Sequence, residues 1–218
     1  MTGRLVGALV VLALLGGAGG YVVATARAES DVAPTTFASP APVPAADPKY
    51  PIVEYVVTPD PTTAALPTDL SLHTAEFEAG GFTLEAPVPN GWRRVGLSGG
   101  TQWNFSDPAN PPNTYVLRIG IVAGDRRSAV VETMSRITAL EAQENDGNSE
   151  NLIIEQQDDS GFTASLIDVG GYRRISIERF LTFPGNLSAH ATIAITGREV
   201  DRGGMTDLLA RVAAGTKP

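Results

Sequence analysis

Cysteine is absent from all 218 residues of this chain. Its absence excludes disulfide bonds, a thiol nucleophile, a thiolate metal site and a lipid-modified N-terminal cysteine. A secreted domain of roughly 145 residues buries enough apolar surface to fold without disulfides. Phosphate-binding loops and dinucleotide-binding motifs are also missing, and histidine occurs only at His73 and His190. The sequence therefore predicts neither a cofactor nor a metal site.

Basic residues are scarce relative to acidic ones, at 16 against 24. Arg4 and Arg27 flank an apolar leader, and no acidic residue precedes Glu29. The part after the leader therefore holds 14 basic and 24 acidic residues, a formal charge of −10. A surface of this sign repels phosphate backbones, so we expect no nucleic-acid partner.

A long hydrophobic run without any charge covers residues 5–26. Residues 1–28 fit a signal peptide with a small-x-small cleavage site that ends at Ala28. They also fit a signal anchor in which residues 5–26 stay in the membrane as a transmembrane helix. Either way we expect the N-terminus inside and the bulk of the chain in an extracytoplasmic position, membrane-anchored or secreted. Both alternatives stay open.

Nine prolines lie between residues 34 and 67, interleaved with alanine, threonine and serine. Proline lacks an amide donor and disfavours helix at the preceding residue, so such a stretch forms neither sheet ladders nor long helices. Polyproline-like extension is the expected state. The sequence thus predicts a disordered spacer at residues 29–69 and one folded domain at residues 70–215.

Alternating and helical patterns of apolar residues follow one another within this domain. The last predicted helix presents Met205, Leu208, Leu209 and Val212 on one side. Tight turns between strands favour antiparallel pairing, so we expect an α+β fold with an antiparallel sheet flanked by helices. The predicted strands are 72–78, 82–86, 102–105, 115–122, 152–157, 162–168, 173–183 and 188–197, and the predicted helices are 128–144 and 204–214.

The first of these two helices, 128–144, is expected to begin at a cap formed by Asp125 or Ser128. Its inward stripe is expected to consist of Val130, Met134, Ile137 and Leu140.

One motif resembles that of serine hydrolases. Residues 96–100 match G-x-S-x-G, with Ser98 in the centre, and Asp168 and His190 follow in the chain order of such enzymes. The mechanism needs the serine on a sharp turn from a strand into a helix. Here a strand-like segment follows, so we predict no enzyme, with a hydrolase using Ser98 as a further alternative.

Three arginine pairs at the ends of predicted elements, 93–94, 126–127 and 173–174, are candidates for one anion-binding cluster. Solvated edges of an acidic protein are the alternative interpretation. Two tryptophans serve either in packing or in a pocket. The candidate binding residues are Trp92, Arg93, Arg94, Trp103, Arg173 and Arg174.

The segment from Phe82 to Trp92, with the letters FTLEAPVPNGW, runs from a strand into P-x-P-x-G-W. It resembles the LpqN/LpqT-type envelope lipoproteins of mycobacteria and other actinobacteria, together with their proline-rich secreted antigen. The similarity extends over roughly residues 70–215. This resemblance implies a PsbP/Mog1-like sandwich and a non-enzymatic, surface-located protein. The chain departs from the lipoproteins because it lacks the lipobox cysteine.

The predicted function is accordingly a non-catalytic cell-envelope module that binds a protein, a lipid or a wall component. An extracytoplasmic sensor or accessory subunit of a membrane complex is the alternative, and it requires that the leader remain uncleaved. The membrane is a partner only in that case.

Overall fold

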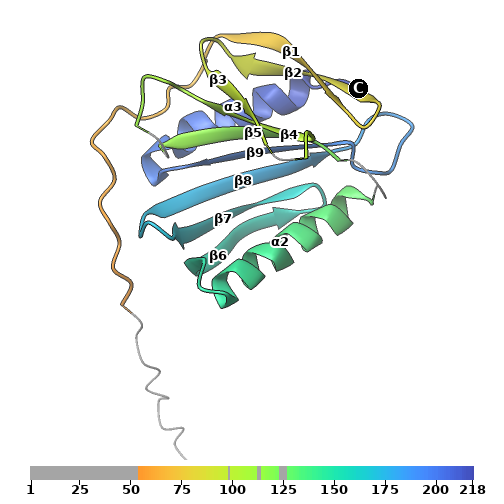
Figure 1. Ribbon diagram of the computed structural model, residues 1–218. Helices are drawn as coiled ribbons and strands as arrows, with labels where there is room; N and C mark the ends of the chain where they lie inside the picture. Colours follow the sequence, from red (N-terminus) through yellow and green to blue (C-terminus); the bar gives the residue numbers. More distant parts are fainter. Residues whose placement is uncertain (1–53, 98, 112–113, 123–126) are drawn as a thin grey trace, which may run out of the picture. The chain divides into compact units, whose positions relative to one another are not determined.

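The computed structural model describes residues 54–97, 99–111, 114–122 and 127–218 (Figure 1). The predicted leader, residues 1–28, and most of the predicted spacer lie outside these ranges. Within the described ranges, every helix is too short or too polar to span a membrane. Residues 53–218 form one compact unit.

Seven antiparallel strands form the main sheet, in the order β3-β4-β5-β9-β8-β7-β6. Successive side chains of each strand point to opposite faces of the sheet. The two faces are covered unequally. The predicted α+β class with an antiparallel sheet is confirmed. The strand bounds are β3 Arg93–Gly96, β4 Gln102–Ser106, β5 Tyr115–Ile121, β6 Ser149–Asp158, β7 Gly161–Asp168, β8 Arg173–Leu181 and β9 Ala191–Gly197.

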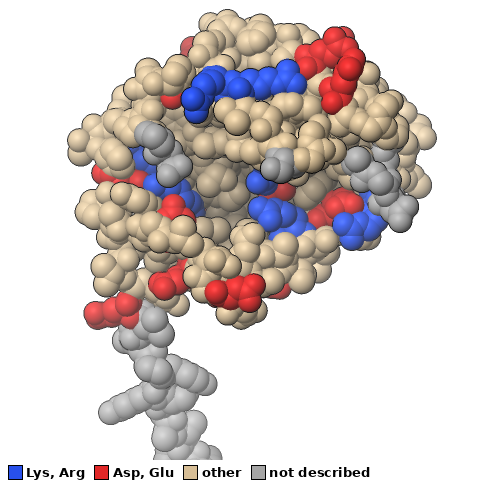
Figure 2. All heavy atoms as spheres, viewed as in Figure 1, with Lys and Arg blue, Asp and Glu red and all other residues tan. Residues whose placement is uncertain are grey.

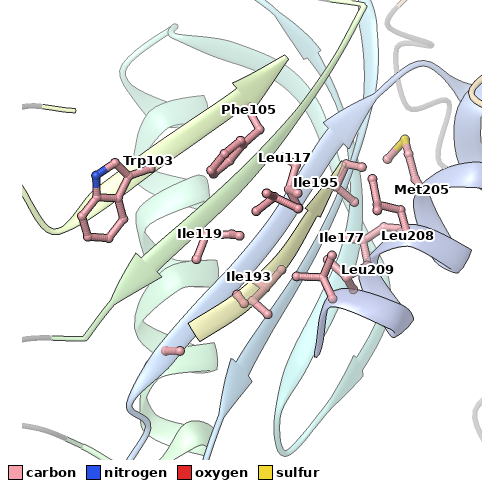
Figure 3. Packing of buried hydrophobic residues seen from close by; sticks show 14 of the residues in the cluster. Trp103, Phe105, Leu117, Ile119, Ile177, Ile193, Ile195, Met205, Leu208 and Leu209 are labelled. Carbon is pink, nitrogen blue, oxygen red and sulfur yellow. The ribbon is translucent and has the colours of Figure 1, made fainter. Parts of the chain in front are cut away.

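One face of the sheet carries the principal core. The hairpin of β1 (Leu72–Ala79) and β2 (Phe82–Pro89) forms a separate two-stranded sheet and covers this face together with α3 (Arg202–Gly215). The side chains of α3 point toward apolar residues of β8 and β9 (Figure 3). All four residues predicted to point inward from this helix are buried.

The other face is covered in part by α2 (Ala129–Asn145), which packs on β6, β7 and β8 (Figure 1). The predicted cap at Ser128 is confirmed, because its hydroxyl accepts from the backbone of Val131 at 3.4 Å. The predicted inward positions of Val130 and Met134 are wrong, since these side chains are 44% and 51% exposed. The small residues Ala129 and Thr133 lie against the sheet in their place, and they permit a close approach of the helix.

Two elements were not expected from the sequence. Strand β3 lies where no element was predicted, and it pairs with β4 at the sheet edge. A short 3-10 helix, Glu199–Asp201, precedes α3. Both are short segments without a periodic pattern of apolar residues, so their secondary structure depends on tertiary contacts.

The folded unit also begins earlier than the predicted boundary at residue 70. Residues 58–67, assigned above to the spacer, pack along one end of the sheet. The backbone of Thr58 donates to Gly171 at 2.8 Å, and Leu66 is only 4% exposed. Proline removes donors but leaves carbonyl acceptors. The guanidinium of Arg198 binds these carbonyls, which explains how a proline-containing segment is held in place.

Candidate functional site

A hollow of about 620 Å³ opens on the face that carries α2 (Figure 2). It exists because α2 packs on β6, β7 and β8 and leaves the α2-side face of β4, β5 and β9 without a covering helix. In Figure 2 basic and acidic side chains gather around it. Its lining comprises Thr101, Gln102, Arg118, Ile121, Val122, Arg127, Glu132, Ser135, Arg136, Ala139, Glu178, Phe180 and Thr192.

Two guanidinium groups share one buried carboxylate at the base of this hollow. Arg118 of β5 donates from Nη2 to Glu178 Oε2 at 3.1 Å, and Arg136 of α2 donates from Nε to the same oxygen at 3.1 Å. The Glu178 side chain is 3% exposed, whereas both arginine side chains are 27% exposed. The other oxygen of Glu178 accepts from the Thr192 hydroxyl at 3.4 Å. The carboxylate is thus fully engaged, while the arginines still face the hollow.

The contact between Arg118 and Glu178 depends on the residue between them. In the sheet, Arg118 pairs with Ala194, and Ala194 in turn pairs with Glu178. Neighbouring strands are about 4.8 Å apart, so the two charged residues stand on backbones separated by about 10 Å. Both long side chains must therefore cross over position 194. The methyl group of an alanine leaves the room that this crossing needs.

The hollow carries an excess of positive charge in a protein whose formal net charge is −8. Its described lining contains three arginines and two glutamates, a net charge of +1. Burial lowers the pKa of Arg118; the nearby Glu178 opposes this effect and Arg136 adds to it. The Nε of Arg118 is buried and has no hydrogen-bond partner among the described residues. An anion in the hollow would supply acceptors for these guanidinium groups.

A third arginine lies at the rim of the hollow. Arg127 binds Glu132 through two parallel hydrogen bonds of 2.9 and 3.0 Å. Its side chain is 49% exposed. A bidentate pair of this kind orients the guanidinium, although an exposed ion pair adds little stability. Arg127 lies on the α2 side of the opening of the hollow.

Both tryptophans predicted as candidate residues take part in packing. Trp103 is 8% exposed and its ring centroid lies 4.9 Å from that of Phe77. Trp92 stacks on Tyr115 with centroids 5.3 Å apart. Arg94 lies over the rings of Phe77 and Trp103, at 4.4 and 5.1 Å. These residues belong to the β1–β3–β4 side of the molecule, and none of them lines the hollow.

The predicted arginine pairs occupy different strands. Arg93 lies on β3 at the sheet edge, while Arg173 and Arg174 begin β8, with β4, β5 and β9 between the two strands. Arg174 is 5% exposed and donates to Asp60 at 2.6 Å, so it anchors the segment before β1. Arg126 lies outside the described residues. The candidate residues therefore do not form one cluster.

Two residues of the alternative hydrolase interpretation, Asp168 and His190, lie far apart. Asp168 ends β7 beside the first residue of β8, whereas His190 precedes β9 beside the last residue of β8. Strand β8 has nine residues. At about 3.3 Å per residue its two ends lie about 25 Å apart. Asp168 and His190 therefore cannot form a relay, and Ser98 lies outside the described residues.

No group of three or more potential metal-ligating side chains occurs in the part of the chain that the structure describes. His73 bonds Asn90 at 2.8 Å and His190 bonds Asn186 at 2.9 Å.

Sequence reasoning missed the three residues that define the hollow, although one signal was present. Arg118 is the one charged residue in the apolar strand 115–122, and Glu178, next to Arg179, follows the apolar alternation of 175–177. A charge inside a strand of a covered sheet requires a partner on the less covered face. That pattern marks both residues, but it does not reveal that they meet each other.

Comparisons with known proteins give similarity of structure alone. No protein-family model matches the chain, and no curated protein matches it by sequence. Among solved structures, the Ran-binding protein Mog1p of Saccharomyces cerevisiae is similar, at 11% identity and a TM-score of 0.44. The alignment covers 67% of this chain and 96% of that chain. The α+β assignment of this chain rests on its own strand order and register.

Proposed function

We propose that this protein is a non-catalytic, extracytoplasmic binding module that takes an anionic ligand in the hollow beside α2. One observation carries this proposal: Arg118 and Arg136 converge on Glu178 and leave an excess of guanidinium donors facing an open hollow. Guanidinium groups are suited to recognise carboxylate and phosphate groups through paired hydrogen bonds. A volume of about 620 Å³ falls within the usual range of small-molecule sites.

The arrangement favours recognition over chemistry. Glu178 is the carboxylate at the base of the hollow, and donors from Arg118, Arg136 and Thr192 occupy its oxygens. A carboxylate held in this way positions guanidinium groups, and it is poorly placed to accept a proton from a ligand. We therefore assign Glu178 a positioning role for the two arginines.

The location in the cell envelope is part of the proposal. It is supported by the uncharged run 5–26, by the proline-rich residues that follow, and by the resemblance of residues 82–92 to the LpqN/LpqT-type family. Sequencing the N-terminus of the chain purified from its native host tests the leader. A start at Glu29 indicates secretion, and an intact leader indicates a membrane anchor. Recovery of the chain only from the cytoplasm would refute the location.

Binding is tested by titrating the protein with acetate and with inorganic phosphate while backbone amide chemical shifts are recorded. We expect saturable shifts in β5, β8 and α2. Arg118→Gln and Arg136→Gln should each weaken binding roughly 10-fold, the usual effect of removing a hydrogen bond to a charged group. Arg93→Gln and Arg173→Gln serve as matched controls that remove the same charge elsewhere. If all four variants bind equally, the hollow is not the site.

A further inference from the structure

We propose that the ligand of this hollow is a monocarboxylate carried on a small apolar body. This inference rests on the proposed function, because it names the chemical class of ligand for the same site. It follows from three properties of the described lining: its net charge, the geometry of its free donors, and the apolar wall beside the arginines.

The charge balance favours a single negative charge. Arg118, Arg127 and Arg136 contribute three positive charges, and Glu132 and Glu178 contribute two negative ones. A monoanion brings the sum of the hollow to zero. A phosphate dianion would leave an excess negative charge beside two carboxylates, and that repulsion is strengthened where water is partly excluded. The two acidic residues therefore discriminate against doubly charged ligands.

The donor geometry favours a planar group. Arg136 donates to Glu178 through Nε, and Arg118 donates to it through Nη2. The two Nη groups of Arg136 take no part in the bond to Glu178, and this side chain is 27% exposed. Parallel N–H groups along one edge of a guanidinium match the two oxygens of a carboxylate. A carboxylate therefore fits the arginines without displacing Glu178.

The hollow is larger than a carboxylate requires, and part of its wall is apolar. Phe180 follows Glu178 by two residues on β8, so both side chains lie on the same face of the strand. Ile121, Val122 and Ala139 complete the apolar part of the lining. A ligand whose carboxylate meets the arginines places its body against this wall. Removing that body from water adds affinity in proportion to the apolar area covered.

Four probes test the inference with the complete protein: benzoate, acetate, benzyl alcohol and inorganic phosphate, each titrated by calorimetry at neutral pH. We expect benzoate to bind at least roughly 10-fold more tightly than acetate or phosphate, because covering its ring contributes a kilocalorie or more. Benzyl alcohol should bind far more weakly than benzoate, since it has the ring without the charge. Arg118→Gln should abolish most of the preference for benzoate over benzyl alcohol.

A variant at an exposed position of the lining distinguishes weaker ligand binding from unfolding of the protein. Ala139 lines the hollow and is solvent-exposed, so substitutions there leave the core intact. Ala139→Asp should lower benzoate affinity roughly 10-fold through charge repulsion. Ala139→Ser, its matched control, should change the affinity by less than roughly 2-fold. Thermal melting of both variants verifies that they are folded.

The outcomes distinguish this inference from the proposed function. Tighter binding of phosphate than of benzoate, or equal binding of acetate and benzoate, overturns the inference and leaves an anion site in place. Equal binding of benzyl alcohol and benzoate also overturns it, because the charge would then be irrelevant. If no anion binds, the proposed function itself fails. Comparing 3-phenylpropionate with N-acetylphenylalanine shows whether the carboxylate belongs to a free acid or to the end of a peptide.

Discussion

Replacing Arg198 by methionine removes a buried cation that joins the segment before β1 to the domain. Its side chain is 1% exposed and that of its partner Asp201 is fully buried. Two hydrogen bonds of 2.7 Å connect the guanidinium to this carboxylate. The same guanidinium donates to the carbonyls of Pro61 and Ala64 at 3.0 and 2.9 Å, and to the Thr63 hydroxyl at 2.7 Å. The pair also holds the pKa of Arg198 above its ordinary value, mainly through the hydrogen bonds that the guanidinium donates to Asp201.

The expected loss follows from the charge left behind. Without Arg198, the Asp201 carboxylate keeps only backbone donors, from residue 198 at 3.2 Å and from Leu66 at 2.9 Å. Removing one partner of a buried ion pair costs about 3–5 kcal/mol of unfolding free energy. For a folded unit of this size, that loss lowers the melting temperature by about 6–20 °C.

Urea denaturation followed by tryptophan fluorescence measures this loss for Arg198→Met. Arg179→Met is the control, because Arg179 and Asp158 form a partly exposed pair with a 3.7 Å contact. Solvent-accessible pairs of this kind contribute at most about 1 kcal/mol. A double variant, Arg198→Met with Asp201→Leu, should be more stable than the single variant, since it leaves no unpaired charge. The reasoning is refuted if Arg198→Met costs less than about 1 kcal/mol, or if the double variant is the less stable one.

Three further predictions use the same preparations. A chain that begins at Leu70 should be at least about 2 kcal/mol less stable in urea than one that begins at residue 54, because it lacks the packed segment 58–67. Ala194→Leu should cost about 1–3 kcal/mol by overpacking and should weaken anion binding by separating Arg118 from Glu178; denaturation and amide-shift titration measure the two effects. Burial, and then the charge of Asp107, raise the pKa of Tyr115 to about 12. Its neutral form therefore contributes stability that is complete below pH 10 and lost as the pH rises to 12; urea midpoints across this range should fall in the wild type and stay flatter in Tyr115→Phe.

Much of the fold follows from local patterns. The alternation in 115–122 and the helical period around Met205 depend only on which neighbours along the chain are apolar, and the structure confirms both. The buried side of α2 shows what local patterns do not predict. The pattern favoured the larger residues Val130 and Met134, whereas the sheet surface accepts the smaller Ala129 and Thr133. A hydrophobic period identifies a helix, but the shape of the opposing surface selects which side of it is buried.

The segment before β1 shows a second limit. Its prolines predicted a spacer, because proline prevents regular pairing. They do not prevent binding by a side chain from elsewhere. Arg198 reaches back across 134 to 137 residues of sequence to bind its carbonyls. No local pattern carries that information, so the domain boundary required the tertiary structure.

The sequence by itself determined the absence of disulfide and thiol chemistry, the acidic charge, the uncharged apolar run 5–26 and the α+β order of elements. Composition and local period are properties of the chain in any conformation. Only the tertiary structure decided the candidate site. Arg118 and Arg136 lie 60 and 42 residues from Glu178. They meet because strand register aligns Arg118, Ala194 and Glu178 in one row on the face that carries α2. Register and helix placement are set by the packing of the whole domain. For this reason the arginine pairs 93–94 and 173–174 lie on separate strands, whereas Arg118 and Arg136 converge.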